Sequence, residues 1–286
     1  MPQWNCACTN CQAARQGRIS ARTQSSVALS EDGQRWFLVN ASPDFSVHIQ
    51  QYPDLQPAPH SLRNTPIAGV LLTNADLDHV LGLFSMREGD RLSIYATRAI
   101  RTALTDYMGV ATVLDVFCGT AWHEPPVTEF APVVADGGDL LYRAIVLSGT
   151  PPPFAKGMSD EGAHSVAYQF LDKRTGGRLL VAPDVAEAND GLREALATSD
   201  AVLFDGTFWS DDELSLVKST AHGAAAMGHV TIKDCSLDLL GKLAAPRKIY
   251  FHINNTNPIL SPDSPEKIAV EAAGIVIGYD GLEFEL

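Results

Sequence analysis

Four residues of the kinds that bind metals or activate water crowd into one turn of this sequence: Asn74, Asp76, Asp78 and His79. They directly follow the apolar run 67–72. Because a turn between a strand and a helix can aim its side chains at one point, this spacing predicts a metal site. The structural alternative is that Asp76 or Asp78 only caps the next helix, a frequent role of aspartate at a helix start.

Two other apolar runs end in an ionisable side chain in the same way. Asp205 follows the run 201–204, and His252 follows the run 249–251. Sheets of α/β proteins gather their ligands at the carboxyl ends of strands. Three such ends together favour one functional site over three unrelated structural residues.

Three of the five cysteines, Cys6, Cys8 and Cys11, fall within six positions. The spacing C-x-C-x-x-C lets thiolates of one tight turn converge on a tetrahedral soft cation, with zinc as our first expectation and a fourth donor from elsewhere in the chain. The alternative is three free thiols near the chain start. Cys118 and Cys235 stand alone and are expected to be small apolar residues.

The composition is that of an ordinary globular protein, with 45% hydrophobic and 19% charged residues. A net charge of −13 opposes binding to a phosphate backbone, so we expect no nucleic-acid partner. No apolar run approaches the ~20 residues of a membrane span, and the first residues do not resemble a signal peptide. We therefore expect a cytoplasmic protein with no membrane partner.

Short strands alternate with helices throughout, which predicts a layered α/β protein. Strands are expected at 36–39, 67–72, 140–147, 165–171, 179–182, 201–204 and 248–253, and helices at 80–87, 99–108, 190–198, 235–243 and 265–273. No linker divides the chain, so we predict one domain over 1–286, with residues 1–11 as its cysteine metal-binding turn. The stretch 151–162 is predicted to be a long loop.

The turn 73–79 resembles the metal motif T-H-x-H-x-D-H of the metallo-β-lactamase superfamily. Asp78 and His79 match it, whereas Asn74 and Asp76 stand where the first two histidines would be. The segment 149–151 resembles the superfamily's G-H-T-P loop without its histidine. The resemblance implies an αββα sandwich with one surviving metal site, whose ligands would be the following: Asp78, His79, Asp205 as the metal-bridging aspartate, and His252 as the last histidine.

Further strings resemble one family of that superfamily, the pyrroloquinoline quinone (PQQ) biosynthesis B proteins. They are 2–6, 22–26, 40–44, 87–89, 227–229, 252–260 and 279–286. Because this family opens with an apolar strand and a glycine-rich turn ahead of these strings, the resemblance also implies that the first strand of the fold is missing here.

The resemblance implies a role in PQQ biosynthesis, as an iron-dependent hydroxylase. Its substrates would be O2 and the tyrosine of a Glu–Tyr pair from a precursor peptide, and other PQQ biosynthesis proteins would be its partners. His79 and His252 with Asp78 or Asp205 match the two histidines and one carboxylate of non-haem Fe(II) oxygenases. The incomplete motif weakens the case for a two-metal hydrolase. A metal-dependent hydrolase and a non-catalytic carrier or transport factor for PQQ or its precursor stay open as alternatives.

Several residues receive roles around that site. His229 resembles an active-site histidine of transfer-RNA-processing relatives and is expected to move protons. Asp76 would tune the site or hold a water, and Asn74 and Arg87 would bind the substrate, Arg87 through a carboxylate. Asp44 is expected to orient the metal turn.

Two predictions concern residues outside the active site. Relatives with these cysteines place the fourth zinc ligand three positions after the last catalytic histidine, where this chain has Asn255. Four other histidines are expected at the surface: His48, His60, His123 and His164.

Overall fold

The computed structural model describes residues 1–59, 62–134 and 137–286, which divide into two compact units. Met1–Thr23 and Gly177–Leu286 form what we call the terminal unit, and Gln24–Gly176 form the central unit. Each is described by itself. The single domain over 1–286 stays a prediction.

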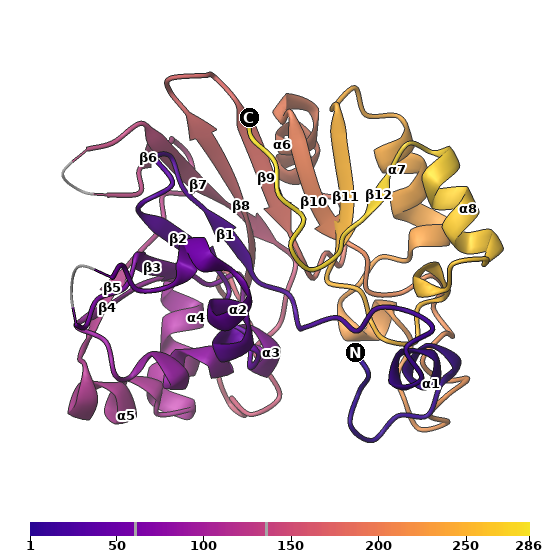
Figure 1. Cartoon of the computed structure of the whole chain (residues 1–286), viewed down its shortest axis with the longest axis horizontal. Helices are drawn as coiled ribbons and strands as arrows, with labels where there is room; N and C mark the ends of the chain where they lie inside the picture. Colours follow the sequence, from indigo (N-terminus) through magenta and orange to yellow (C-terminus); the bar gives the residue numbers. More distant parts are fainter. Residues whose placement is uncertain (60–61, 135–136) are drawn as a thin grey trace. The chain divides into compact units, whose positions relative to one another are not determined.

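The strands β1–β5 of the central unit form a sheet in sequence order (Figure 1). Their bounds are β1 Val27–Leu29, β2 Trp36–Val39, β3 Ile67–Leu71, β4 Leu92–Tyr95 and β5 Thr120–His123. β1 pairs antiparallel with β2, and the other neighbours are parallel. The carboxyl ends of β2 and β3 therefore lie side by side, next to the predicted metal turn.

The central unit also holds antiparallel pairs between β6 (Ala131–Pro132), β7 (Leu140–Leu147) and β8 (Ser165–Asp172). Its α-helices are α2 Phe45–Gln51, α3 Leu77–Val80, α4 Arg98–Thr102 and α5 Val110–Phe117. Short 3₁₀ or π turns complete the connections at Pro53–Leu55, Leu81–Met86 and Ala103–Tyr107.

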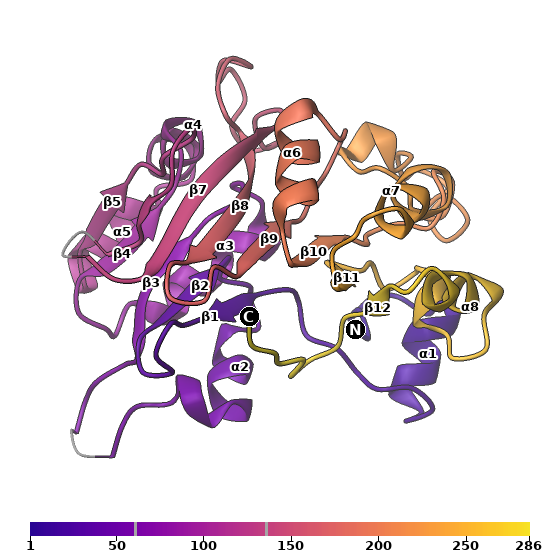
Figure 2. The same ribbon diagram turned by 90° about the horizontal axis from the view of Figure 1, so that it is seen from above.

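The terminal unit is built on parallel strands in the order β12-β11-β10-β9. These are β9 Arg178–Ala182, β10 Ala201–Asp205, β11 Arg247–Phe251 and β12 Val276–Ile277. Its α-helices are α1 Thr9–Arg15, α6 Asp190–Thr198, α7 Leu237–Gly241 and α8 Pro265–Ala272, with short turns at Ala225–Met227, Ile232–Ser236 and Pro258–Leu260. All of β10 is buried, and α6 lies over β9 and β10 in Figure 2, which explains the nearly continuous apolar run 201–204.

The predicted strands are confirmed within one or two residues at each end, and α6 matches its predicted bounds. The loop predicted at 151–162 contains no helix or strand. The helix predicted at 99–108 is α4 followed by a π turn, because the chain there widens its hydrogen-bond pattern. The sequence did not predict the helices α1, α2 and α5 or the strands β1, β4, β5, β6 and β12. No helix in the described parts of the chain is long and apolar enough to span a membrane.

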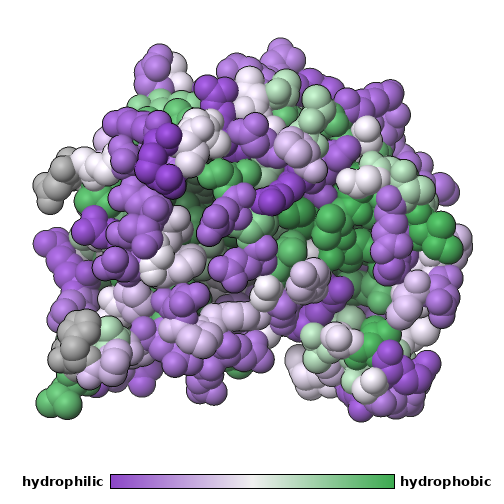
Figure 3. Space-filling view, turned by 45° about the horizontal axis from the view of Figure 1, so that its top comes forward, coloured by the Kyte–Doolittle hydropathy of each residue, from purple (hydrophilic) through white to green (hydrophobic). Residues whose placement is uncertain are grey.

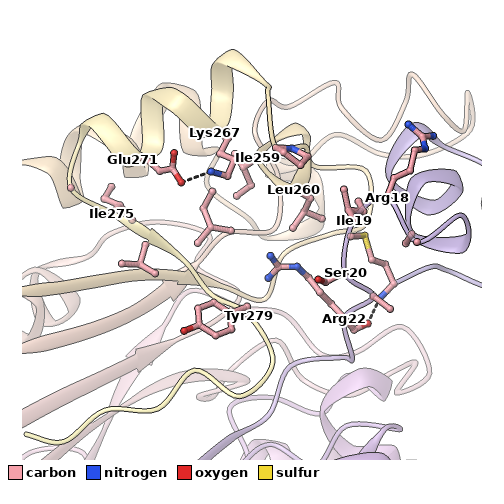
Figure 4. Close-up of a pocket in the computed structure, with 18 residues that line it drawn as sticks. Arg18, Ile19, Ser20, Arg22, Ile259, Leu260, Lys267, Glu271, Ile275 and Tyr279 are labelled. Atoms are coloured by element: carbon pink, nitrogen blue, oxygen red, sulfur yellow. Dashed lines mark hydrogen bonds and ion pairs between the residues drawn. The ribbon is translucent and has the colours of Figure 1, made fainter.

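A pocket of about 1110 Å³ lies in the terminal unit between the extended segment 17–22 and the α8–β12 region (Figure 4). Its wall is largely apolar, with Ile259, Leu260 and Ile275, and Figure 3 shows hydrophobic surface over the part of the molecule that carries α7, α8 and β12. Lys267 and Glu271 of α8 form an ion pair at its rim. Because no histidine, aspartate or cysteine lines this pocket, it is separate from the metal-binding candidates.

Candidate functional site

Three side chains of the terminal unit converge where parallel strands end. Asp184 follows β9, His252 follows β11, and His229 lies on the connection between β10 and β11. The Oδ1 atom of Asp184 lies 3.8 Å from Nε2 of His229 and 3.6 Å from Nδ1 of His252. One ligand atom of each residue lies within 4.8 Å of the other two, so two histidines and one carboxylate can meet one cation.

Asp205 orients both histidines, His229 by a direct hydrogen bond and His252 through the Thr207 hydroxyl. Its Oδ2 lies 2.8 Å from Nδ1 of His229, and its Oδ1 accepts a hydrogen bond from the Thr207 hydroxyl at 2.5 Å. That hydroxyl lies 2.9 Å from Nδ1 of His252. Because the carboxylate takes the Thr207 proton, Nδ1–H of each histidine is the donor, and in the neutral form of either ring the acceptor lone pair falls on Nε2.

The Asp205 carboxylate is completely buried and accepts two further bonds from the backbone N–H groups of Val185 and Thr207. Burial alone would raise its pKa, but the charges and hydrogen bonds of His229 and His252 outweigh burial and hold the pKa below its ordinary value. Burial lowers the pKa of His229, and the neighbouring Asp205 carboxylate more than reverses that effect. The pair therefore favours an ionised Asp205 and a protonated His229.

Backbone geometry aims two of these side chains. Asp184 has φ of 50° and His252 has φ of 53°, in the left-handed region that residues other than glycine seldom adopt. Val230 N–H donates to Val185 O at 2.6 Å and joins the His229 segment to that of Asp184. Such conformations persist where surrounding structure fixes them, often at functional sites.

In the central unit, the turn after β3 holds His79 in one orientation. Asp76 N–H donates to Asn74 Oδ1 at 3.0 Å, which identifies that atom as the amide oxygen. The same oxygen lies 2.8 Å from Nδ1 of His79, so Nδ1 carries the proton and Nε2 is the atom suited to a metal. Oδ2 of Asp78 lies 3.8 Å from that Nε2.

Asn40, which directly follows β2 and has φ of 64°, supports this turn. Its side chain donates to Thr73 Oγ1 at 2.9 Å and accepts from Thr73 N–H at 2.9 Å. The segment after Asn40 also touches Gly82, where a Cβ atom would stand 2.3 Å from Ser42 O, so only glycine fits. Asp44, which we expected to orient the turn, instead accepts a bond from Gln24 N–H.

The other predicted site residues of the central unit have more ordinary surroundings. Asp76 stands at the N-cap position of α3 but makes no capping bond with its side chain. Asn74 is buried, and its side-chain oxygen accepts a hydrogen bond from Nδ1 of His79, so this side chain contacts another residue of its own turn. Arg87 is half exposed, donates to Phe84 O and pairs with Glu88. Roles for Asp76 in catalysis and for Asn74 and Arg87 in substrate binding stay predictions.

The cysteine cluster, formed by Cys6, Cys8 and Cys11, brings its three sulfur atoms within 4.8 Å of one another. Burial raises the pKa of Cys11 to about 11. Burial acts in the same direction on Cys8, but hydrogen bonds from Cys11, Cys6 and Asn255 outweigh it and lower the pKa. A cation would let all three sulfurs ionise together, so this donor set fits zinc.

Asp184 was missed by the sequence analysis, although it obeys the same strand-end rule, two residues after the apolar run of β9. The contacts favour Asp184 over Asp205 as the carboxylate ligand, because the Asp205 oxygens already accept bonds from His229, Thr207 and the backbone. The prediction that Asp78 and His79 share a metal with the terminal-unit residues joins the two units and stays a prediction.

The surface histidines were predicted with mixed success. His123 is exposed and stacks on Tyr95. His48 is half-buried, and His60 lies outside the described residues. His164 is buried, with Nε2 3.0 Å from Ser159 O, so its predicted surface position is wrong; the long loop 151–162 folds back to cover it.

The sequence matches the Beta-lactamase superfamily domain over residues 35–253. Coenzyme PQQ synthesis protein B of Cupriavidus necator is 40% identical over 293 residues, which cover 100% of this chain and 95% of that relative. Coenzyme PQQ synthesis protein B of Klebsiella pneumoniae (strain 342) is 38% identical over 290 residues, with 100% and 94% covered.

Solved structures are similar over the same extent. The crystal structure of Zn²⁺-bound PqqB from Methylobacterium extorquens has a TM-score of 0.89 and 36% identity, covering 100% of this chain and 95% of that one. A diphosphatase from the PhnP family has a TM-score of 0.68 at 20% identity, covers 100% and 92%, and shares the fold alone. The predicted metallo-β-lactamase-like α/β fold is confirmed.

Proposed function

This chain belongs to the coenzyme PQQ synthesis protein B family of the β-lactamase superfamily, and from that premise we propose that it hydroxylates the tyrosine of a Glu–Tyr precursor with iron and O2. The observation that carries the proposal is the convergence of His229, His252 and Asp184 in the terminal unit. Two histidines and a carboxylate are the donor set typical of non-haem Fe(II) oxygenases; His252 and Asp184 would supply one of each, the family resemblance implies His79 as the second histidine, and His229 would stand beside the metal.

His252 and Asp184 are the proposed metal ligands of the terminal unit, and Asp78 and His79 are ligands on the strength of the family resemblance. Bound iron would supply the redox chemistry that lets O2 react with a phenol ring, which zinc cannot do because it has no redox activity. Asp205 fixes both imidazoles through His229 Nδ1 and the Thr207 hydroxyl, so that Nε2 of each ring faces the reaction.

His229 is the proposed proton carrier. The Asp205 carboxylate raises the pKa of His229 and favours its protonated form, in which Nε2 carries a proton instead of a lone pair for a metal. A histidine oriented by a buried carboxylate can deliver that proton from Nε2 and take it back. This division leaves His252 and Asp184 for the metal and His229 for proton transfer.

We also propose a structural zinc at the cysteine cluster, separate from the active-site metal. The three sulfurs converge, and the zinc of the M. extorquens PqqB crystal structure shows that a relative binds this metal. Cytoplasmic location and interaction with other PQQ biosynthesis proteins are part of the proposal.

The experiment is an oxygen-uptake assay on anaerobically purified protein loaded with Fe(II) or Zn(II), with a Glu–Tyr dipeptide as the substrate. Mass spectrometry should show oxygen added to the tyrosine only with the iron form. Equal product from the zinc form would refute the redox mechanism. Cleavage of the dipeptide would favour a hydrolase, and stoichiometric binding of PQQ without turnover would favour a carrier.

A further inference from the structure

The connection that leaves β10 contains a loop that is closed at its base by Asp211. The carbonyl oxygen of Asp211 accepts a hydrogen bond from Ala224 N–H at 3.1 Å, and its Oδ1 atom accepts one from Ala225 N–H at 2.9 Å. No helix or strand lies between these two ends. The segment 211–224 is therefore an Ω-loop, a compact loop of a kind that often carries function.

The base of this Ω-loop supports His229. Ala224 is buried, and its carbonyl oxygen accepts a hydrogen bond from the backbone N–H of His229 at 3.0 Å. The rings of His229 and Phe208 lie edge to face, with their centroids 5.5 Å apart. Phe208 O in turn accepts a bond from Ile232 N–H at 3.0 Å. The backbone and the ring of His229 therefore both depend on how this connection is folded.

Glu213, near the start of the Ω-loop, is bonded to two segments at once. Its buried carboxyl group accepts hydrogen bonds from Trp209 N–H at 2.6 Å and from the Thr256 hydroxyl at 2.5 Å. Trp209 lies on the connection after β10, and Thr256 lies on the connection after β11, four residues past His252. Glu213 thus joins the connection that leads to His229 to the one that begins with His252.

The hydrogen bonds continue from Thr256 to His252 itself. Thr256 Oγ1 accepts a bond from the side-chain amide of Asn254 at 2.5 Å, and Asn254 N–H donates to Thr207 O at 3.1 Å. The hydroxyl of Thr207 lies 2.9 Å from Nδ1 of His252. A displacement of Thr256 can therefore reach His252 through bonded neighbours.

We propose that Glu213 is a positioning residue of this site, which fixes where His229 stands relative to His252 by joining the Ω-loop to the connection after β11. The inference rests on the proposed function, in which His252 binds the metal and His229 transfers the proton. A proton carrier must lie within hydrogen-bond reach of the atom that it serves. A small displacement of that carrier slows the reaction even though its imidazole is intact.

Three variants test this link at both of its ends. Glu213→Ala removes both bonds, and Thr256→Val removes the hydroxyl while keeping the carboxyl group. Glu213→Gln retains the link, because an amide can accept from Trp209 N–H and donate to the Thr256 oxygen. Asp212→Ala is the matched control on the same loop, since the Asp212 carboxylate bonds the nearby Ser210 hydroxyl at 2.8 Å.

The first measurement is hydrogen exchange of the His229 backbone amide in metal-free, full-length protein. The amide of Phe204, in the fully buried strand β10, is the reference that reports global unfolding. We expect exchange at His229 to rise at least about fivefold relative to Phe204 in Glu213→Ala and Thr256→Val. Glu213→Gln and Asp212→Ala should match the unmodified chain. Unchanged relative exchange in both Glu213→Ala and Thr256→Val would overturn the proposal.

The second measurement separates positioning from simple anchoring of the loop. In the iron-loaded protein, Glu213→Ala should lower kcat about tenfold, less than removal of the His229 imidazole, with KM for the Glu–Tyr dipeptide and iron content unchanged. Glu213→Gln should restore kcat. If exchange rises but kcat does not fall, Glu213 only anchors the loop and the proposal is wrong. If the unmodified iron form does not hydroxylate the dipeptide, the proposed function fails, and the exchange result alone decides whether Glu213 positions His229.

Discussion

Glu213 is a buried carboxyl group whose ionisation should reduce the stability of the folded chain. It is 6% exposed and accepts hydrogen bonds from Trp209 N–H at 2.6 Å and from the Thr256 hydroxyl at 2.5 Å. Burial raises its pKa from 4.5 to about 7 against the opposing effect of those bonds. The native protein therefore binds this proton more tightly than the unfolded chain does.

The sign follows from proton linkage. Between pH 4.5 and about 7 the folded state keeps the proton that the unfolded state has lost, so stability falls as the pH rises and is level above pH 7. The two pKa values correspond to a loss of roughly 3 kcal/mol at pH 8, taken as an upper bound. Glu213→Gln removes the loss, because the neutral amide can accept from Trp209 and donate to the Thr256 oxygen.

Urea unfolding of metal-replete protein from pH 5 to pH 8.5 measures the effect. The gain in unfolding free energy of Glu213→Gln over the unmodified chain should rise from under about 1 kcal/mol at pH 5 to about 3 kcal/mol at pH 8. Glu124→Gln, at an exposed position, is the control for the loss of a carboxyl group, and it should not reproduce the rise expected of Glu213→Gln. A pH-independent difference for Glu213→Gln would refute the reasoning.

Three further predictions concern the metals and the charge. His79→Ala and His252→Ala should each abolish iron binding and tyrosine hydroxylation while the chain stays folded. His229→Ala should keep its iron and slow turnover about 10²-fold. Full activity of the His79 variant, or loss of iron from the His229 variant, would contradict the assigned roles. A triple Cys→Ser variant of the cysteine cluster should lose about one zinc per chain by elemental analysis and retain active-site metal, and unchanged zinc content would disprove the site. The net charge of −13 should make binding to transfer RNA negligible, so salt-dependent binding at micromolar concentration would show that reading to be wrong.

The sequence predicted that Asp205 and His252 lie close together because of one property of parallel strands. A strand buried on both faces is a continuous apolar run, and the first polar residues after it mark its carboxyl end. Asp205 ends β10 and His252 follows β11. The register of this parallel pair places Asp205 opposite Phe251, the residue just before His252. That pairing brings the two side chains to one edge of the strands, as their positions in the sequence predicted.

The separate roles of the polar groups could not be read in the same way. His229 is 24 residues from Asp205 in the chain, and the bond between them depends on how the connection after β10 returns to the strand ends. Sequence spacing records neither that path nor which imidazole nitrogen is already occupied. Asp205 was therefore expected to bind metal, whereas its contacts favour a supporting role.

Asp184 was missed for a conformational reason. Pro183 separates it from β9, and a proline after a strand usually signals a turn without chemistry. Among the described residues, three non-glycine residues have φ near +50° to +64°, Asn40, Asp184 and His252, and each stands within two residues of the end of a parallel strand. This conformation costs of order 1 kcal/mol per residue. Glycine would relieve that cost at each position and would remove a side chain that fixes a turn, as Asn40 does, or that is a proposed metal ligand. The unfavourable backbone is thus evidence, independent of any motif, that each of these positions requires a side chain.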